Sequence, residues 1–284
     1  MGVLEGKVAV ITGGTRGLGS AIARAYAAEG AAVVLAARSS ASVDRAVAQL
    51  TAAGAEATGL VADVGELSQV QALADHAVRA LGKFDVWINN AGTAGPYGPT
   101  MGLPPEAFRQ MVQTNILGVY YGSHVALKHF IPRGSGKLIN LLGHGYRQPL
   151  PWQNAYGSSK AWVRNFTLAL ADETRDSGVG VYAFSPGMVL TEMLTEVEVI
   201  QGSENRLKKY PSVVRMLAKP PEIPARKAVW LASAATDGKT GLLISLFSPW
   251  TMLRGALREG LRALLKRPSP PLDIHIQSIP PYQE

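Results

Sequence analysis

Tyr156 and Lys160 stand four residues apart in the stretch YGSSK and could together carry acid–base chemistry. Residues at this spacing share one face of a helix, so the two side chains would meet the same space. A free tyrosine, with a pKa of about 10, exchanges protons poorly near neutrality, and a nearby ammonium lowers that pKa by favouring the phenolate. Reduction of a carbonyl needs such a proton donor for the oxygen, besides a hydride for the carbon. An isolated pair of this kind is more often an exposed helical pair, so the interpretation depends on the segments around it.

The surrounding chain alternates between short apolar runs and stretches of helical periodicity. The stretch GSAIARAYAAEG, for example, repeats small and apolar residues at intervals of three and four and stops at Gly30. Apolar strands separated by helices are typical of a parallel sheet that is covered on both faces and binds ligands at the carboxyl ends of its strands. We therefore expect an α/β fold, with a single Rossmann-type, doubly wound domain, a mostly parallel seven-stranded sheet and a C-terminal helical extension. The expected strands include residues 7–13, 31–37, 56–63, 84–90, 136–142 and 180–186.

The first expected strand runs into the glycine-rich turn TGGTRGLG and then into a helix. Gly13, Gly17 and Gly19 let the backbone come close to a pyrophosphate, and the start of the helix directs free N–H groups and a positive dipole end at it. A tight strand-to-helix connection can need glycines without binding any nucleotide, but the position after the first strand favours a nucleotide site.

The end of the second strand indicates which dinucleotide is bound. An acidic residue there would hydrogen-bond the ribose of NAD, whereas this chain has Ala37 followed by Arg38. Arg16, inside the glycine turn, can reach the same place, and two planar guanidinium groups suit a phosphate. We expect NADP(H) as the cofactor; the alternative is that both arginines are ordinary surface residues.

The composition argues against several other classes of protein. A chain of 284 residues with 47% hydrophobic residues can form one large core, and without cysteine it has no disulfide and no thiolate metal site, so we expect no metal. Much of the formal net charge of +7 lies in residues 250–267, where five basic residues stand against one glutamate, so we expect no nucleic-acid partner. No apolar run approaches the roughly 20 residues of a membrane span, and we expect a cytoplasmic protein.

Taken in order, the motifs resemble the classical short-chain dehydrogenase/reductase family from residue 5 to about residue 245. The matching stretches are TGGTRGLG, ADV, NNAG, QTNILG, YGSSK and SPGMVLTEM. The resemblance implies that Tyr156 is the acid/base, that Lys160 modulates it and holds the nicotinamide ribose, and that Asn115 anchors a water leading from that lysine to solvent. It also implies a substrate loop at about 188–220. The expected cofactor-binding residues are Gly13, Thr15, Arg16, Gly17, Leu18, Gly19, Arg38, Ser39, Asp63, Val64, Asn90, Ala91, Gly92, Tyr156, Lys160, Pro186, Gly187, Val189 and Thr191.

The chain departs from the family pattern at Gly143. The family's usual serine, which hydrogen-bonds the substrate oxygen, falls at this position when residues are counted back from Tyr156. Loss of one preorganised donor commonly lowers the rate by about two to three powers of ten. His144 or Tyr146 could supply a donor, the substrate could, or the enzyme could tolerate the loss. A lone histidine beside a strand end is more often structural or solvent-facing.

The C-terminal part resembles the chlorophyll b reductase branch of the family. The shared features are SPGMVLTEML, the glycine at position 143 and a longer tail. That resemblance implies reduction of a formyl group on a large tetrapyrrole. We divide the chain into a cofactor-binding domain, residues 1–247, and a tail, residues 248–284.

The tail contains an expected amphipathic helix with leucines on one side. Arg254, Arg258, Arg262 and Lys266 recur every four residues on another side. Such a helix could make peripheral contact with an anionic membrane through residues 250–267, or its apolar face could pack on its own domain or on a partner subunit.

Two functions follow as hypotheses. The first is an NADP(H)-dependent carbonyl reductase or alcohol dehydrogenase acting on a bulky apolar small molecule. The second is a cofactor-binding but catalytically weak sensor or scaffold, which only the glycine at position 143 supports. Intact Tyr156, Lys160 and Asn115 favour the first. Members of the resembled family are often homodimers or homotetramers paired through long helices, here about 105–129 and 153–177, and we expect the same.

Overall fold

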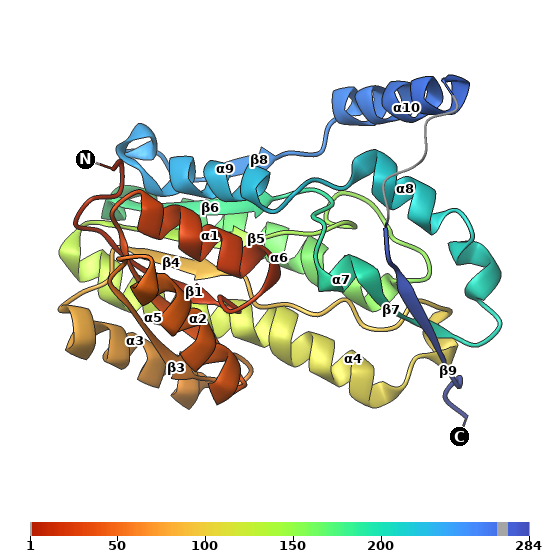
Figure 1. Ribbon diagram of the computed structural model, residues 1–284. Helices are drawn as coiled ribbons and strands as arrows, with labels where there is room; N and C mark the ends of the chain where they lie inside the picture. The colour runs from red at the N-terminus through yellow and green to blue at the C-terminus, as the bar shows by residue number, and fades with distance from the viewer. Residues whose placement is uncertain (1, 266–271, 284) are drawn as a thin grey trace.

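The computed structural model describes residues 2–265 and 272–283, and its main element is a seven-stranded parallel sheet (Figure 1). The strands stand in the order β3-β2-β1-β4-β5-β6-β8, so the chain moves outward from β1 and then returns to its other side at β4. The predicted doubly wound α/β fold is therefore confirmed. The strands are β1 (Val8–Thr12), β2 (Ala32–Ala37), β3 (Ala57–Val61), β4 (Val86–Asn89), β5 (Gly136–Leu141), β6 (Val179–Ser185) and β8 (Leu242–Ser245).

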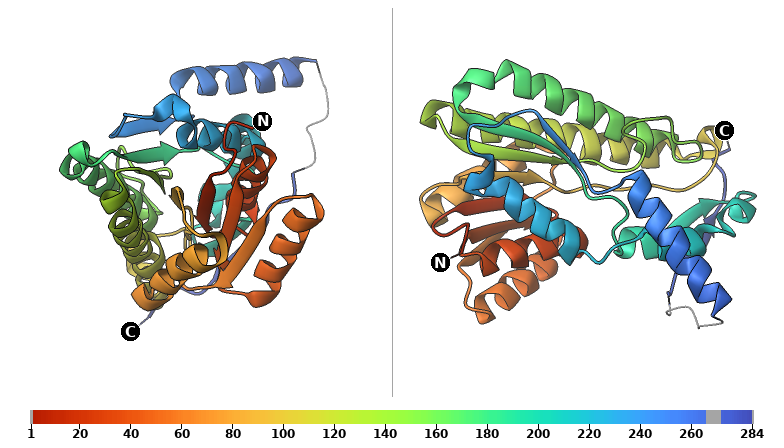
Figure 2. Two further views of the ribbon diagram at one scale, coloured as in Figure 1. Left: turned by 90° about the vertical axis from the view of Figure 1, so that its left-hand side faces the viewer. Right: turned by 90° about the horizontal axis from the view of Figure 1, so that it is seen from above.

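Helices cover both faces of this sheet (Figures 1 and 2). One face packs against α1 (Gly17–Ala28), α2 (Ser40–Ala52) and α9 (Glu222–Ala232), and the other against α3 (Leu67–Leu81), α5 (Gly118–Phe130) and α6 (Asn154–Glu173). Every residue of β1 is buried, because alternate side chains enter two different cores.

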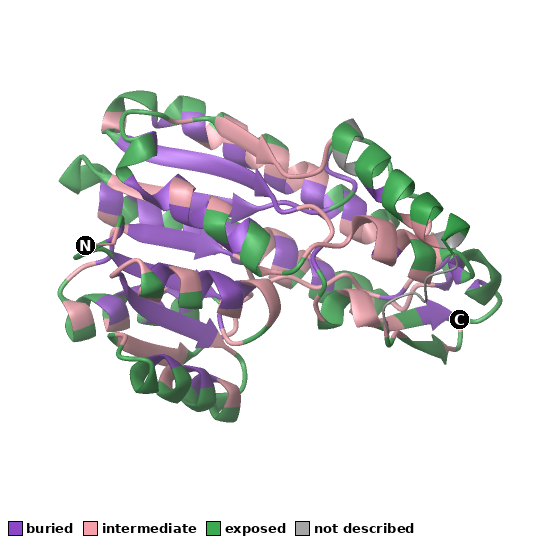
Figure 3. Cartoon of the chain, turned by 45° about the horizontal axis from the view of Figure 1, so that its top comes forward, coloured by how far each residue is buried: buried purple, intermediate pink, exposed green. Residues whose placement is uncertain are grey.

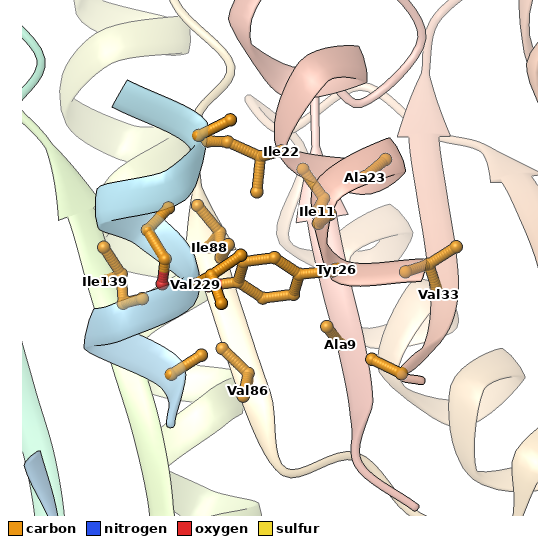
Figure 4. Packing of buried hydrophobic residues seen from close by; sticks show 14 of the residues in the cluster. Ala9, Ile11, Ile22, Ala23, Tyr26, Val33, Val86, Ile88, Ile139 and Val229 are labelled. Atoms are coloured by element: carbon orange, nitrogen blue, oxygen red, sulfur yellow. Dashed lines mark hydrogen bonds between the residues drawn. The ribbon is translucent and has the colours of Figure 1, made fainter. Parts of the chain in front are cut away.

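Tyr26 joins α1 to α9 across the first of these cores. Its ring lies among strand side chains such as Val86 and Ile88 (Figure 4). Its hydroxyl donates a hydrogen bond to the carbonyl oxygen of Ala228 at 2.8 Å. Burial of the ring with a satisfied hydroxyl fixes the helix that follows the substrate loop against the sheet.

A second group of elements lies beyond the carboxyl ends of the strands. The tail folds back here, and its strand β9 pairs in parallel with β7 in a separate two-stranded sheet (Figure 1). The sequence did not predict this strand. The elements are α4 (Pro105–Met111), which continues through a π-helical turn (Val112–Leu117) into α5, then α7 (Glu192–Thr195), β7 (Glu196–Ile200), α8 (Tyr210–Leu217), α10 (Pro249–Leu264) and β9 (His275–Ile279), with 3₁₀ turns at Thr100–Gly102 and Glu204–Leu207. Further 3₁₀ turns, at Ile131–Arg133, Arg175–Ser177 and Ala234–Thr236, lie at the opposite edge of the sheet, before β5, β6 and β8.

Within residues 2–265 and 272–283, no helix is both long enough and apolar enough to cross a bilayer.

Candidate active site

Tyr156 and Lys160 lie in the first turns of α6, beside the end of β5. The Lys160 Nζ lies 5.8 Å from the centroid of the Tyr156 ring and donates a hydrogen bond to the carbonyl oxygen of Leu141 at 3.3 Å. Lys160 is only 5% exposed. The two side chains therefore share one protected side of the helix, which is the geometry that an acid–base pair needs.

Burial sets the proton affinities of this pair in the protein alone. It raises the pKa of Tyr156 to about 12 and lowers the pKa of Lys160 to about 8, because a protein interior disfavours both the phenolate and the ammonium. The expectation that the Lys160 ammonium, together with the nicotinamide charge, lowers the pKa of the phenol stays a prediction. Desolvation outweighs the attraction of the lysine, so a further positive charge beside the phenol would be needed to lower its pKa.

Gly143 lies directly against the Tyr156 hydroxyl. A Cβ added to Gly143 would stand 2.0 Å from the Tyr156 Oη and 2.8 Å from its Cζ, whereas ordinary Cβ contacts begin at about 3.4 Å. The space of the expected serine side chain is therefore occupied by the Tyr156 hydroxyl itself. Because Gly143 has no side chain, the Tyr156 hydroxyl can lie directly against the end of β5.

Asn115 connects the loop after β4 to α6. It lies, fully buried, in the π-helical turn between α4 and α5, a kind of turn often found at functional sites. Its Oδ1 accepts a hydrogen bond from the Thr93 N–H at 2.9 Å, and its Nδ2 donates to the Thr93 carbonyl oxygen at 2.9 Å and to the Ser159 Oγ at 3.1 Å. A Cβ on Gly92 would lie 3.3 Å from the Asn115 Oδ1 and 3.6 Å from the Lys160 Nζ. The structure therefore brings Asn115 and Lys160 to the same small residue.

The glycine turn after β1 fits a dinucleotide pyrophosphate. Gly13 and Gly17 have φ values of +61° and +53°, which favour glycine. A Cβ on Gly19 would lie 2.2 Å from the Gly13 carbonyl oxygen, so a side chain does not fit there either. The turn therefore exposes its backbone to a ligand. Arg16, at the N-cap of α1, makes no side-chain cap, which leaves the helix N–H groups available. Asn90 supports the turn, since its Nδ2 donates to the carbonyl oxygens of Thr12 and Gly13 at 2.9 and 3.0 Å.

The residues expected to select the cofactor lie at the ends of β1 and β2. Arg38 follows β2 and is exposed, and Ser39 caps α2 by accepting a hydrogen bond from the Ser42 N–H at 3.4 Å. Arg16 instead forms an exposed ion pair with Glu192 at 2.5 Å. An exposed pair of this kind contributes about 1 kcal/mol or less, so its opening toward a bound phosphate is a small cost.

The remaining expected cofactor residues gather at the same edge of the sheet. The Asp63 Oδ1 accepts a hydrogen bond from the Gly65 N–H at 2.9 Å after β3, and Val64 is buried beside it. A Cβ on Gly17 would lie 3.2 Å from the Thr191 Cγ2, so the start of the substrate loop lies over the glycine turn. Pro186, Gly187 and Val189 lead from the end of β6 into that loop, and Thr15, Leu18 and Ala91 belong to the glycine turn, the start of α1 and the loop after β4.

The two residues that could replace the serine as donors have different surroundings. His144 is exposed, and its ring stands edge-on to Phe247 with centroids 6.4 Å apart. Tyr146 is buried in an apolar cluster with Val119 and Val163, and its hydroxyl has no hydrogen-bond partner among the described residues. Among the described residues, no hydrogen bond or ring contact joins either residue to Tyr156.

Trp152, which the sequence did not single out, forms part of the wall beside Tyr156. Its φ is +69°, a rare conformation for a large side chain and one that concentrates at functional sites. The Gly98 N–H donates to its carbonyl oxygen at 2.8 Å, and the Arg206 guanidinium stacks 3.6 Å from the centroid of its ring. Arg206 belongs to the substrate loop, so three separate segments meet at this residue.

The cavity between Trp152 and Tyr156 is small, at about 10 Å³. That is room for about one water molecule. Its lining combines apolar residues, which are Ala94, Pro96, Leu103, Met111 and Trp152, with the polar residues Thr100, Gln153 and Asn154. A separate open groove of about 550 Å³ lies along α4 and does not include Tyr156.

The C-terminal strand β9 holds β7, which belongs to the expected substrate loop, in place. β7 lies between Tyr97, whose N–H donates to the Glu198 carbonyl oxygen at 2.9 Å, and β9, which pairs with all five β7 residues. The Ser278 Oγ also donates to the Glu204 Oε1 at 2.8 Å. Opening of the loop must therefore break contacts with residues that lie about 75 positions later in the chain.

Comparisons with known proteins agree with this geometry. The family model described as short chain dehydrogenase matches residues 7–200. The 3beta-hydroxysteroid dehydrogenase 1 of Eggerthella lenta is 34% identical over 256 residues, which cover 89% of this chain and 96% of that protein. The probable chlorophyll(ide) b reductase of Arabidopsis thaliana is 34% identical over 239 residues, which cover 78% of this chain but only 47% of that protein.

Two solved structures share the fold with a TM-score of 0.76 each. The 3-ketoacyl-(acyl-carrier-protein) reductase from Brucella melitensis, complexed with NADH, is 30% identical, with 86% of this chain and 97% of that chain covered. A variant of actinorhodin polyketide ketoreductase with NADPH is 28% identical, with 84% and 95% covered.

Proposed function

Since the chain belongs to the short-chain dehydrogenase/reductase family, we propose that it is an NADP(H)-dependent carbonyl reductase or alcohol dehydrogenase that acts on a bulky apolar substrate. Membership makes the protein an oxidoreductase with a nicotinamide cofactor. The observation that carries the proposal is the pairing of Tyr156 with the buried Lys160, which lies with Asn115 beside Gly92, at the same sheet edge as the glycine turn.

Tyr156 is the proton donor in this proposal. The nicotinamide, when bound, supplies or accepts the hydride. In the reducing direction the Tyr156 Oη gives its proton to the substrate oxygen, so the carbonyl becomes a hydroxyl and the tyrosine becomes a phenolate. In the oxidising direction the phenolate takes that proton back.

Lys160 stabilises the phenolate and can restore its proton. Its pKa of about 8 lies below that of the phenol, so transfer of a proton from the ammonium toward the phenolate is favourable. Asn115 holds the segment beside Lys160 through Ser159 and Thr93, which keeps the lysine side chain near Gly92. We infer that Asn115 maintains the path by which Lys160 regains a proton.

The preference for NADP(H) rests on charge at the end of β2. Ala37 and Arg38 leave no carboxylate there to repel a 2′-phosphate, and Arg16 lies in the adjacent turn. The guanidinium of Arg38 is exposed and free to make a bidentate contact with phosphate oxygens. These residues, together with the glycine turn, would hold the cofactor.

The apolar part of the cavity lining supports an apolar substrate. Trp152, Met111 and Leu103 present hydrocarbon surface toward Tyr156, and Leu190 and Met193 of the substrate loop are exposed. Because the cavity is so small, a bulky substrate must displace part of its wall, such as Trp152, whose ring carries Arg206 of the loop at about 188–220. Two relatives are named for a steroid and for chlorophyll(ide) b, and a tetrapyrrole formyl group is one candidate.

We also propose a cytoplasmic homodimer or homotetramer that pairs through α5 and α6. Tyr120 on α5 is exposed and stands edge-on to Phe166 on α6, and Trp162 stacks on Phe166 with centroids 4.7 Å apart. Light scattering of the purified chain would give the mass of the assembly. Substitution of Tyr120 by lysine should then shift that mass to the monomer.

The alternative is a cofactor-binding sensor or scaffold with little activity. A panel of apolar aldehydes and ketones, offered with NADPH and separately with NADH, distinguishes the two functions. We expect oxidation of NADPH with at least one substrate, faster than by a folded Tyr156→Phe variant that still binds NADPH. Binding of NADPH without any turnover above that variant would support the sensor and reject the enzyme.

A further inference from the structure

Helix α10 exposes its leucines and turns its polar side toward the protein. Leu253, Leu257, Leu261 and Leu264 fall on one side of the helix together with Trp250, and all five are exposed, Leu264 by 77%. We call these five residues the leucine face. Figure 3 shows most of the visible surface of this helix as exposed. The alternative that the leucine face packs on its own domain is therefore wrong.

The opposite side of α10 fixes this orientation. Gly255 is buried at the crossing with α8, where a Cβ would lie 2.3 Å from the Met216 carbonyl oxygen. Arg258 donates hydrogen bonds to the carbonyl oxygens of Arg215 and Met216 at 2.5 and 3.5 Å, which satisfies the C-terminal end of α8. A rotation that buried the leucines would break the contact at the glycine and uncover these carbonyl groups.

Exposed basic residues lie beside the leucine face on α10 and at the start of α8, the helix on which α10 packs. Arg254 is exposed on α10 next to Leu253, and Lys208 and Lys209 are exposed where α8 begins. Residues 204–217 and 249–264 contain seven basic residues against Glu204 and Glu259. These two segments, which comprise α10, α8 and the turn before α8, therefore carry +5 of the net charge of +7.

We propose that the leucine face binds the surface of a bilayer that contains anionic lipids. A helix with a leucine and tryptophan face beside basic residues is the pattern of a helix that lies in the membrane interface. With 16 residues, α10 is too short to span the hydrocarbon core, so it lies along the surface. A second copy of the chain fits less well, since a two-fold contact through the leucine face would bring Arg254 and its neighbours into like-charge contact.

This binding does not depend on the proposed reaction. It would place the protein at the membrane, in which apolar substrates dissolve, whatever the identity of the substrate. Helix α10 packs on α8, which belongs to the expected substrate loop (Figure 1).

Flotation of the full chain with vesicles tests the proposal. We expect the protein to float with vesicles of mixed phosphatidylcholine and phosphatidylglycerol and to remain behind with phosphatidylcholine alone. Added salt should release it, because the charge contribution is screened. A variant with Leu257→Ser and Leu261→Ser should bind the anionic vesicles roughly tenfold or more weakly, because hydrocarbon insertion is lost.

A matched control changes two exposed apolar residues elsewhere. Leu67→Ser with Val78→Ser alters α3, and we expect its vesicle binding to equal that of the parent protein. A second variant, with Arg254→Gln and Lys209→Gln, should bind anionic vesicles several-fold more weakly, and Arg45→Gln on α2 is its control. This charge variant keeps the test valid if the serine variant does not fold.

Three results would overturn the proposal. The first is a parent protein that does not float with anionic vesicles, and the second is equal binding by the parent and the folded leucine-face variants. The third is a parent protein whose self-association, measured by light scattering, is lost in the variant with Leu257→Ser and Leu261→Ser. That last result would assign the leucine face to a second copy of the chain.

Discussion

Restoring a serine at position 143 should lower the activity of this protein, although the family's usual residue is a serine. A Cβ at this position would stand 2.0 Å from the Tyr156 Oη, so the hydroxyl must retreat by roughly 1 Å or more to reach even a tight contact. A displacement of about 1 Å can cost on the order of a hundredfold in rate, and overpacking of a filled site costs about 1–3 kcal/mol in stability. The Lys160 Cγ would also lie 3.3 Å from the new atom, so the tyrosine cannot simply be pushed toward the lysine.

The serine hydroxyl would add a donor that can be worth about two to three powers of ten when it is well placed. Gly143→Ala separates the two effects, because it adds the Cβ without the donor. We expect kcat of Gly143→Ala to fall by on the order of a hundredfold and kcat of Gly143→Ser to recover part of that loss without exceeding the parent value. Gly260→Ser is the control, since a Cβ there meets nothing within 4 Å.

Steady-state kinetics with the best substrate of the panel, together with thermal melting of each variant, provide the measurement. A Gly143→Ser variant that is faster than the parent, with Gly143→Ala unchanged, would refute the reasoning. It would mean that the Tyr156 hydroxyl does not occupy the serine position in solution.

Lys160→Met should stabilise the fold while it removes activity. The pKa of Lys160 in the folded protein, about 8, lies below its unfolded value of 10.5, so burial of the ammonium costs roughly 3 kcal/mol of stability below pH 8. That cost fades between pH 8 and 10.5. Urea unfolding at pH 7 and pH 10 should therefore show a gain for Lys160→Met that shrinks at the higher pH; a gain independent of pH would contradict the assignment. Arg38→Asp should raise KM for NADPH at least tenfold and leave KM for NADH unchanged or lower, with a smaller effect from Arg16→Ala; equal changes for both cofactors would exclude a role in phosphate recognition. Trp152→Ala should raise the ratio of kcat/KM for large over small carbonyl substrates several-fold, and Arg206→Ala should act in the same direction because it frees the same ring; an unchanged ratio would remove Trp152 from the substrate wall.

The sheet and the acid–base pair could be predicted because their signals are local. The buried strands read as short apolar runs, and the four-residue spacing of Tyr156 and Lys160 places them on one side of α6. The glycine turn is equally local, since φ values above zero at Gly13 and Gly17 require the residue type that the sequence supplies.

The tail and the substrate wall could not be predicted because they depend on distant contacts. β9 follows a proline-rich stretch and becomes a strand only by pairing with β7, 79 residues earlier. The periodicity of α10 revealed an apolar side but not that Gly255, on the other side, would approach Met216. Trp152 adopts its unusual backbone conformation with Gly98 and Arg206 as partners, and no pattern near position 152 signals them.

The role of Tyr156 is tested most directly by the single-turnover oxidation of enzyme-bound NADPH. The parent protein and Tyr156→Phe are loaded with the cofactor, mixed with saturating substrate and followed by nicotinamide absorbance, so that differences in cofactor binding do not enter. We expect at least a hundredfold slower oxidation by Tyr156→Phe, with NADPH affinity unchanged within a few-fold. Equal rates for the two proteins would contradict Tyr156 as the proton donor and, with it, the proposed function of the site.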